Sequence, residues 1–284
     1  MRNLKYMLVL VLAFLLAGCK FAVLDPRGVI ADSQARLLVI SVGLMLLVVI
    51  PTIIMSFVFA WRYRKRHKTA VYAPEFTHSA WIEVVCWAVP CVIIGFLAYL
   101  TWVYTHKLDP YRPIASDKPV LVVQAVALDW KWLFIYPDQH IATVNYVEIP
   151  VGVPVRFFIT ADAPMNSFEM PRLAGQIYAM PGMRSQLNMM ADQVGLYDGL
   201  STNYSGDGFA SMAFKVNVTS EDDFQAWVVQ AQKAGARLSN AEYLKLSKPS
   251  SENPVSYYSS VEPDLFSEII NKYMMPNSKL GIGN

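Results

Sequence analysis

The stretch Leu37–Trp61 reads LLVISVGLMLLVVIPTIIMSFVFAW and contains no charged residue. A second stretch, Val84–Tyr104, reads VVCWAVPCVIIGFLAYLTWVY and is equally free of charge. Each reaches the roughly 20 apolar residues that a helix needs to cross the hydrocarbon core of a bilayer. The single proline inside each stretch is better tolerated in membrane helices than in soluble ones. The two stretches predict transmembrane helices at residues 37–61 and 83–105.

The segment between the two stretches indicates their orientation. It begins with the sequence RYRKRHK at Arg62–Lys68, a cluster of basic residues beside a membrane helix. Such clusters face the cytoplasm by the positive-inside rule, so residues 62–82 are predicted to form a cytoplasmic loop in which His67 is solvated. A nucleic-acid-binding patch is the rival interpretation, and it is weaker because membrane helices flank the cluster on both sides. The hairpin is therefore predicted to begin and end outside the cytoplasm.

The N-terminus has the form of a bacterial export signal. A short basic head precedes about ten apolar residues, too few to span a membrane, and Leu-Ala-Gly-Cys follows at residues 16–19. That tetrapeptide resembles the lipobox of bacterial lipoproteins, in which the cysteine receives a diacylglyceryl group. Residues 1–18 are predicted to be a signal peptide, Cys19 the lipidated first residue of the mature chain, and residues 19–36 an extracytoplasmic segment. The alternative is a chance cysteine after an ordinary signal peptide.

The composition of the 284-residue chain fits a membrane protein. Apolar residues make up 54% and charged residues 16% of the chain, against about 25% charged residues in soluble domains. The net charge of +2 gives no sign of nucleic-acid binding, and no phosphate-binding glycine loop or His-Glu-x-x-His motif occurs. The cysteines are Cys19, Cys86 and Cys91, so the C-terminal half has neither a disulfide framework nor a thiolate metal site. Cys86 and Cys91 point in different directions on one helix and are predicted to act as small apolar residues.

From Lys118 onward the sequence changes to short β-rich runs of alternating polarity. Turn residues such as Pro137-Asp138 separate the runs, and His140 is predicted to lie at a loop or strand end. Several short strands at this spacing predict a β-sandwich or barrel at residues 118–218. The predicted strands are Pro119–Val126, Lys131–Tyr136, Val144–Ile149, Val153–Ile159 and Gly208–Val218.

Residues 219–284 are predicted to form an aromatic-rich helical ending. Ser220-Glu-Asp-Asp223 has the form of a capping box at the start of a helix that runs to Gly235. A second helix is predicted at residues 241–247, and a third opens with Pro263 at a first helical position. The aromatic content indicates that this ending packs on the domain or on a partner.

A signal-bearing N-terminus, a two-span hairpin with a basic inner loop and an outer β-domain occur here in an order that resembles subunit II of the haem–copper oxidases. HSAWIEVVCWAVP at His78–Pro90 is similar to the family's opening of the second helix, and DWKWLFIYP at Asp129–Pro137 to its aromatic segment. Three further stretches fall where the copper-site loops occur: Met165–Phe168, Gln176–Gly182 and Tyr197–Gly206. Within the family, the chain resembles subunit II of the cytochrome bo-type ubiquinol oxidases. The implied fold is a membrane α-helical hairpin plus an all-β cupredoxin-like sandwich with a C-terminal helical tail.

The resemblance locates the positions of a copper centre. In the cytochrome c oxidase branch, two cysteines, two histidines, a methionine and a backbone carbonyl hold two copper ions, because soft sulfur and imidazole ligands suit copper. Asn166 stands here at the first histidine position, and Leu200 and Tyr204 stand at the two cysteine positions. These three are predicted to be lost copper-ligand positions.

The remaining ligand positions give the same expectation. The second histidine position falls on Gly208 or Phe209, and Met212 is the candidate for a surviving thioether ligand. The outer domain contains no cysteine, and its one histidine is His140. The chain is therefore predicted to bind no metal and no other cofactor.

A chain without this copper relay cannot pass electrons from soluble cytochrome c. The resemblance implies a proton-pumping oxidase in which ubiquinol donates directly to a haem in subunit I, where oxygen is reduced to water. Haems and copper are expected in that subunit, and subunits I, III and IV and membrane lipid are the expected partners. This chain would be a non-catalytic subunit that acts in assembly and stability, in the bacterial inner membrane with its large C-terminal domain in the periplasm.

Three further residues acquire roles through the resemblance. Glu83 matches a carboxylate at the entrance of a proton-uptake path into subunit I, and the alternative is a carboxylate favoured by the helix dipole. Trp130 and Trp132 match a segment that helps electrons enter copper. Without copper, they are interpreted as packing or interface aromatics.

Two other functions are weighed against this one. A stand-alone, membrane-anchored cupredoxin-like binding lipoprotein would need only its lipid anchor, so the hairpin motif argues against it. A cytochrome c oxidase subunit II with bound copper would need two thiolates that the outer domain does not contain.

Overall fold

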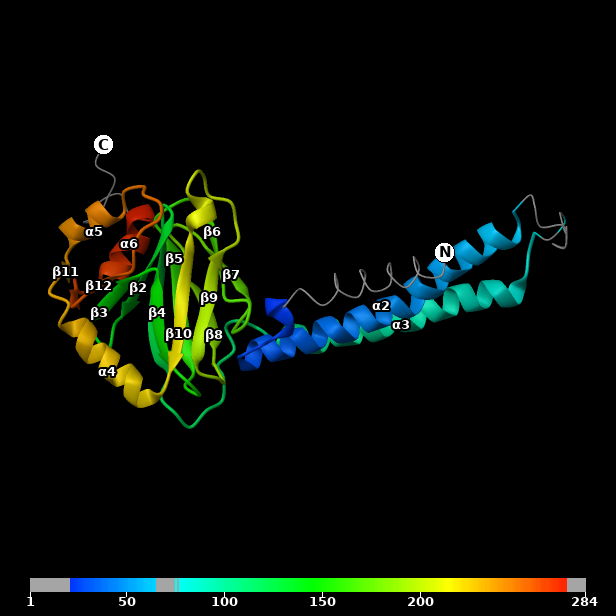
Figure 1. Ribbon diagram of the computed structural model, residues 1–284, viewed down its shortest axis with the longest axis horizontal. Coiled ribbons are helices and arrows are strands. Elements are labelled where there is room, and N and C mark those ends of the chain that lie inside the picture. Colours follow the sequence, from blue (N-terminus) through cyan, green and yellow to red (C-terminus); the bar gives the residue numbers. More distant parts are fainter. Residues whose placement is uncertain (1–20, 65–74, 76, 275–284) are drawn as a thin grey trace, which may run out of the picture. The chain divides into compact units, whose positions relative to one another are not determined.

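The computed structural model describes residues 21–64, 75 and 77–274. Cys19 and His67 lie outside these residues. The chain falls into two units, Ser33–Asp109 and the remainder. The first unit is a helical hairpin, and the second contains the β-sheets and the C-terminal helices (Figure 1).

Two long helices form the hairpin, α2 (Val29–Arg62) and α3 (Ala80–Lys107). Both are long and apolar enough to cross a membrane, and most of their large apolar side chains are exposed. Hydroxyl groups within the helices bond to the preceding turn, since Thr52 and Thr101 each donate from Oγ1 to the carbonyl four residues earlier at 2.8 Å. These local bonds satisfy the hydroxyls without a partner helix, which matters in lipid because unpaired polar groups are costly there.

Two sheets form the sandwich, the first with the strand order β12-β3-β2-β1-β5-β8 and the second with the order β4-β10-β9-β6-β7. β1 pairs antiparallel with β2 and parallel with β5, so Gln124 lies opposite both Ile135 and Phe158. The strands of the sandwich proper are β1 (Leu121–Leu128), β2 (Lys131–Tyr136), β3 (Ile141–Val144), β4 (Tyr146–Pro150), β5 (Val155–Ala161), β6 (Asn166–Glu169), β7 (Gln176–Ala179), β8 (Ser185–Met189), β9 (Gly195–Ser201) and β10 (Ala213–Thr219).

Two predicted strands differ from the observed ones by more than the position of their ends. The predicted strand Val144–Ile149 is divided between β3 and β4, because Asn145 has a φ of 56°. Asparagine tolerates this left-handed conformation, and the Asn145 side-chain oxygen accepts a hydrogen bond from the Trp132 amide at 2.8 Å. The predicted strand Gly208–Val218 begins instead with a 3-10 turn, η2 (Phe209–Ser211), and only its second part forms β10.

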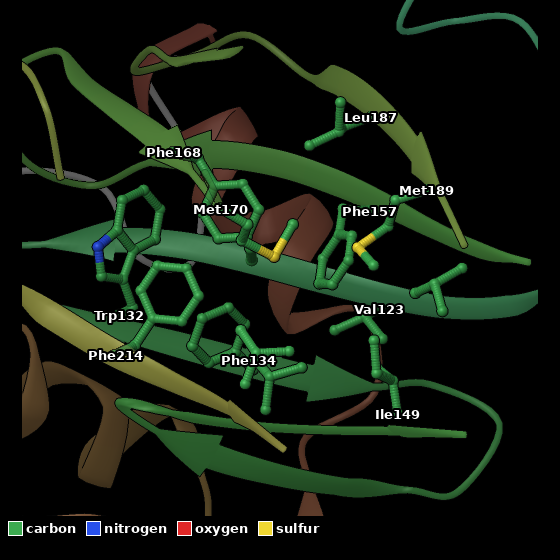
Figure 2. Packing of buried hydrophobic residues seen from close by; sticks show 14 of the residues in the cluster. Val123, Trp132, Phe134, Ile149, Phe157, Phe168, Met170, Leu187, Met189 and Phe214 are labelled. Atoms are coloured by element: carbon green, nitrogen blue, oxygen red, sulfur yellow. The ribbon is translucent and has the colours of Figure 1, made fainter. Parts of the chain in front are cut away.

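Aromatic side chains fill the space between the two sheets. Trp132 and Phe134 extend from β2, Phe168 from β6 and Phe214 from β10 (Figure 2). The centroids of Phe168 and Phe214 lie 5.1 Å apart with their planes within 5°, and Trp132 meets Phe168 edge-on at 5.1 Å. Because aromatic rings bury large apolar areas, this cluster is a major source of the stability of the sandwich.

The other face of the six-stranded sheet is also apolar, and residues 237–274, called here the C-terminal segment, cover it. The segment consists of β11 (Arg237–Leu238), α5 (Asn240–Leu246), β12 (Ser256–Tyr258), β13 (Ser260–Val261) and α6 (Leu265–Met274). It contributes Leu238, Tyr243, Tyr258, Leu265, Phe266 and Ile269 to a buried cluster with Val126, Leu128, Leu133 and Ile135 of the sheet. β12 also extends the sheet by pairing with β3. The helical ending therefore packs on the domain.

Helix α4 (Glu221–Gln232) precedes the C-terminal segment and packs on the core between the sheets. Ser220 caps it, as predicted, since the Ser220 hydroxyl accepts a hydrogen bond from the Asp223 amide at 3.1 Å. The apolar side chains that α4 buries are Phe224, Val228 and Ala231.

The residues ahead of α2 lie against the sandwich. The Arg27 amide donates to the Arg172 carbonyl at 2.6 Å, and the Asp192 amide donates to the Arg27 carbonyl at 3.1 Å. Gly28 forms a β-bridge with Ala191. A Cβ atom at Gly28 would lie 2.4 Å from the Leu173 carbonyl oxygen, so this close approach requires glycine.

Candidate functional site

The structure brings the predicted copper-ligand positions to neighbouring strands. Asn166 opens β6, and Leu200 lies near the end of β9 opposite Ala213 of β10. Met212 immediately precedes β10, and its carbonyl accepts a hydrogen bond from the Ser201 amide at 3.2 Å. Tyr204 lies in the loop between β9 and β10, residues 202–212. We call this region, with the loop 162–165 before β6, the ligand-position end of the sandwich.

Asn166 is fully buried and belongs to a polar network. Its side-chain oxygen accepts a hydrogen bond from the Ser201 hydroxyl. Next to it, the Thr202 hydroxyl donates to the Ser167 hydroxyl at 3.0 Å, and the Asn203 side-chain amide donates to the Met165 carbonyl at 2.9 Å. Amides and hydroxyls therefore hold together loops that would carry ligands in a copper-binding relative.

Leu200, Tyr204 and Met212 differ widely in exposure. Met212 is 2% exposed, whereas Leu200 is 37% and Tyr204 is 73% exposed. The ring of Tyr204 meets Phe209 edge-on at 5.7 Å. A hydrocarbon side chain has no metal-binding atom, so at these three positions only the Met212 thioether is a ligand type that copper prefers.

The donor set at this end does not fit a copper centre. Soft sulfur and imidazole ligands suit copper, and the positions hold an amide, a hydrocarbon side chain, a phenol and one thioether. Within residues 21–64, 75 and 77–274, no three His, Cys, Asp or Glu side chains lie close enough to hold a metal ion.

Trp130 packs against the backbone of the loop 202–212. It adopts a φ of 63°, and its indole nitrogen donates to the Ser205 carbonyl at 3.2 Å. A Cβ atom at Gly206 or Gly208 would lie 3.2 Å or 2.4 Å from the ring, so both glycines let the backbone pass close to the indole. Trp132 is buried in the core, so both tryptophans make packing contacts.

Glu83 lies in the first turn of α3, and its carboxylate oxygen lies 2.5 Å from the Nδ1 atom of His78. Both side chains are more than half exposed in the chain. Negative charge is favoured in the first turn of a helix, and the Glu83 amide is bonded to the Ser79 carbonyl at 3.0 Å. The pairing with His78 was not predicted, although both residues belong to the stretch HSAWIEVVCWAVP.

The structure also buries charged side chains that the sequence does not mark, among them Asp162 and Lys131. The carboxylate of Asp162, in the loop before β6, is fully buried and accepts hydrogen bonds from Tyr243 and Tyr273. Lys131 at the start of β2 is 1% exposed, and burial lowers the pKa of its ammonium group. Burial also raises the pKa of neighbouring Asp129. No local pattern marks these residues, because their partners lie far away in the sequence.

Two family models match the chain. The periplasmic domain of cytochrome c oxidase subunit II matches residues 102–221, and the COX aromatic-rich motif matches residues 232–277. The second match coincides with the segment that covers the six-stranded sheet.

Known proteins resemble most of the chain. It is 52% identical over 259 residues to cytochrome bo(3) ubiquinol oxidase subunit 2 of Pseudomonas putida, covering 91% of this chain and 82% of that protein. It is 50% identical over 264 residues to ubiquinol oxidase subunit 2 of Acetobacter aceti, covering 92% and 85%. The solved periplasmic domain of cytochrome oxidase subunit II from Bradyrhizobium japonicum is 23% identical, with coverage of 44% of this chain and 100% of that one and a TM-score of 0.41.

The identity to the two bacterial oxidase subunits extends over the hairpin as well as the sandwich, because it covers 91% and 92% of the chain. The chain therefore belongs to the family of subunit 2 of the haem–copper quinol oxidases.

Proposed function

We propose that this chain is the copper-free subunit 2 of a proton-pumping terminal oxidase that oxidises ubiquinol and reduces oxygen to water. The observation behind this proposal is the set of side chains at the ligand positions, namely the Asn166 amide, the Leu200 hydrocarbon and the Tyr204 phenol. The outer domain also contains no cysteine that could replace the missing thiolates.

Electrons then reach the complex without passing through this chain. Ubiquinol is the proposed donor because the relatives from Pseudomonas putida and Acetobacter aceti are named ubiquinol oxidase subunits. Haems and copper belong to subunit I in this proposal, and subunits III and IV complete the complex. Soluble cytochrome c is not an electron donor in this proposal, because the chain lacks the cysteine and histidine ligands of the copper centre that would accept its electron.

The proposed role of the chain itself is non-catalytic. The hairpin presents exposed apolar side chains along both helices, which suits contact with membrane lipid and with a partner subunit. The basic residues after α2 support an inner-membrane location with this loop in the cytoplasm and the sandwich in the periplasm. Assembly and stability of the complex are the functions that this arrangement supports.

Glu83 is the proposed direct contribution to turnover. Its exposed carboxylate, paired with His78, lies at the same end of the hairpin as the basic loop. A carboxylate at that depth of a membrane subunit is suited to collecting protons for a path into subunit I.

Purification of the intact complex from its native membranes in mild detergent tests the proposal. We expect the chain to copurify with haem-bearing subunits, and oxygen uptake to be supported by ubiquinol but not by reduced cytochrome c. The separated chain should contain no copper after incubation with copper salts. Thiolate–copper absorption bands, uptake driven by cytochrome c, or isolation without any haem-bearing partner would each contradict the proposal.

A further inference from the structure

Asp162 is the most heavily bonded carboxylate at the ligand-position end. It follows β5 directly, four residues before Asn166, and its side chain is fully buried. Tyr243 donates a hydrogen bond to one carboxylate oxygen at 2.5 Å. Lys272 and Tyr273 donate to the other oxygen at 2.7 Å and 2.6 Å. A buried carboxylate is costly unless it is paired and hydrogen-bonded, so these contacts are needed for its burial.

All three donors come from the C-terminal segment. Tyr243 lies on α5, and Lys272 and Tyr273 lie on α6, 81 to 111 residues away from Asp162 in the sequence. Burial and the nearby carboxylate raise the pKa of the Tyr243 hydroxyl, and burial and a hydrogen bond to the same carboxylate raise that of Tyr273. Both phenols therefore remain protonated donors near neutral pH.

A second buried charge ties the same segment to the turn between β1 and β2. The Lys131 ammonium group donates to the Lys248 carbonyl at 2.9 Å and to the Ser250 hydroxyl. Lys131 directly follows Trp130, the residue that supports the loop 202–212. The C-terminal segment is thus bonded both to the loop 162–165 and to the β1–β2 connection, whose Trp130 contacts the loop 202–212.

Metal ions at sites of this kind cross-link the loops that carry their ligands, and metal binding contributes directly to folding. The side chains at these positions in the present chain do not fit copper, so the loops need another cross-link. Asp162 and Lys131 supply one that consists of protein groups alone.

We infer that the C-terminal segment is the structural clamp of the ligand-position loops in this chain, with Asp162 as its anchoring residue. This inference rests on the proposed absence of copper. It gives the aromatic-rich motif a defined task, which is to hold the loops 162–165 and 202–212 in shape where a metal would otherwise hold them.

Hydrogen-exchange mass spectrometry of the full-length chain in its purified oxidase complex tests the inference. Asp162→Ala should make amide exchange in both loops and in the C-terminal segment roughly tenfold faster, because it leaves the Lys272 charge without its buried partner. Tyr273→Phe removes one hydroxyl and keeps the ring, so it should produce a smaller increase in the same places. Exchange in β4 and β10 should not change in either variant.

The matched control is Glu221→Gln, which breaks an exposed ion pair with Lys118 at 3.0 Å. It should leave exchange in both loops at the wild-type rate. If Asp162→Ala prevents assembly, Tyr273→Phe and Lys272→Met still decide the question. Two results would overturn the inference. One is wild-type exchange in both loops together with faster exchange in the C-terminal segment, and the other is an equal increase of exchange in every strand. Copper content and donor assays on the wild-type complex report separately on the proposed function, so the two failures are distinguishable.

Discussion

Glu83 and His78 form the smallest unit with a proposed role in turnover. The carboxylate and the imidazole are 2.5 Å apart, and both are accessible at the start of α3. The helix dipole alone would favour a carboxylate at this position. A variant must therefore separate a proton-collecting role from a helix-capping role.

Glu83→Gln makes that separation. The amide keeps the size of the side chain and loses the exchangeable acidic proton, so we expect oxygen uptake per haem to fall several-fold while the amount of assembled complex stays unchanged. An oxygen electrode measures the uptake, the haem content of the purified complex measures the amount assembled, and proton release by vesicles measures pumping. Normal uptake and pumping, or a loss of assembly without a loss of turnover per haem, would leave Glu83 as a helix cap.

Tyr243 gives the chain a defined response to alkaline pH. Its ordinary pKa is 10.0, and burial raises the pKa in the folded chain. The folded state therefore keeps a proton that the unfolded state loses, so this contribution to stability is complete below pH 10 and is lost as the pH rises above it. The loss is about 1.4 kcal/mol per pH unit for one such group.

The comparison of Tyr243→Phe with the wild type measures this effect. The variant lacks the titrating hydroxyl, so the difference in unfolding free energy between the two proteins should shrink by about 1.4 kcal/mol for each pH unit above about 10. Denaturant unfolding of the full chain between pH 8 and pH 11 provides the curves. Tyr136, also fully buried with a raised pKa, offers an independent repeat. Parallel curves across this range would contradict the prediction.

At the scale of elements, helix α4 depends on a local cap. The Ser220 hydroxyl accepts a hydrogen bond from the Asp223 amide, one of the donors that a helix start leaves unpaired. Ser220→Ala should lower the free energy of unfolding by about 1 kcal/mol. Ser220→Thr keeps an oxygen in place and serves as the control. Equal stability of the alanine and threonine variants in denaturant titrations would show that the cap contributes nothing.

The elements also show which parts of the fold are visible in the sequence. The hairpin and β2 were predictable, because charge-free length and dense β-forming residues are local signals. β9 was not, since its buried positions are Tyr197, Gly199 and Ser201, which have no apolar alternation. Gly199 is required there because a Cβ atom would lie 2.1 Å from the Phe214 ring. β9 forms because β6 and β10 pair with it, and a pattern within the strand's own sequence cannot show this pairing.

The candidate site also has one part that could be predicted from the sequence and one part that could not. The resemblance to the family's copper-site loops predicts that Asn166, Leu200 and Tyr204 mark the ligand-position end, and the structure places these residues on adjacent elements. The buried partners of Asp162 could not be found, because three separate chain segments must fold for the carboxylate to meet Tyr243 and Lys272. Hydropathy cannot reveal a charge whose burial depends on such distant donors.

At the scale of the whole molecule, the predicted lipid anchor at Cys19 would have the same task as the two helices that are long and apolar enough to cross a membrane. Membrane helices hold a protein far more firmly than acyl chains do. Cys19→Ser should therefore abolish lipidation and removal of residues 1–18, while the chain stays in the membrane fraction. Intact-mass spectrometry and membrane fractionation measure both outcomes, and Cys86→Ser is the matched control. A wild-type chain that retains residues 1–18, or a variant released from membranes, would refute the prediction.

The pairing of β12 with β3 has a consequence for the timing of biosynthesis. Ser256 lies opposite Val144, so the partner of β3 is translated long after β3 itself. At about 5–20 residues per second, the delay between the two strands is roughly 6–22 s. During this interval β3 is an open sheet edge beside an uncovered apolar face, a state prone to aggregation. We therefore expect the chain to need chaperones most in the interval between the synthesis of β3 and that of β12.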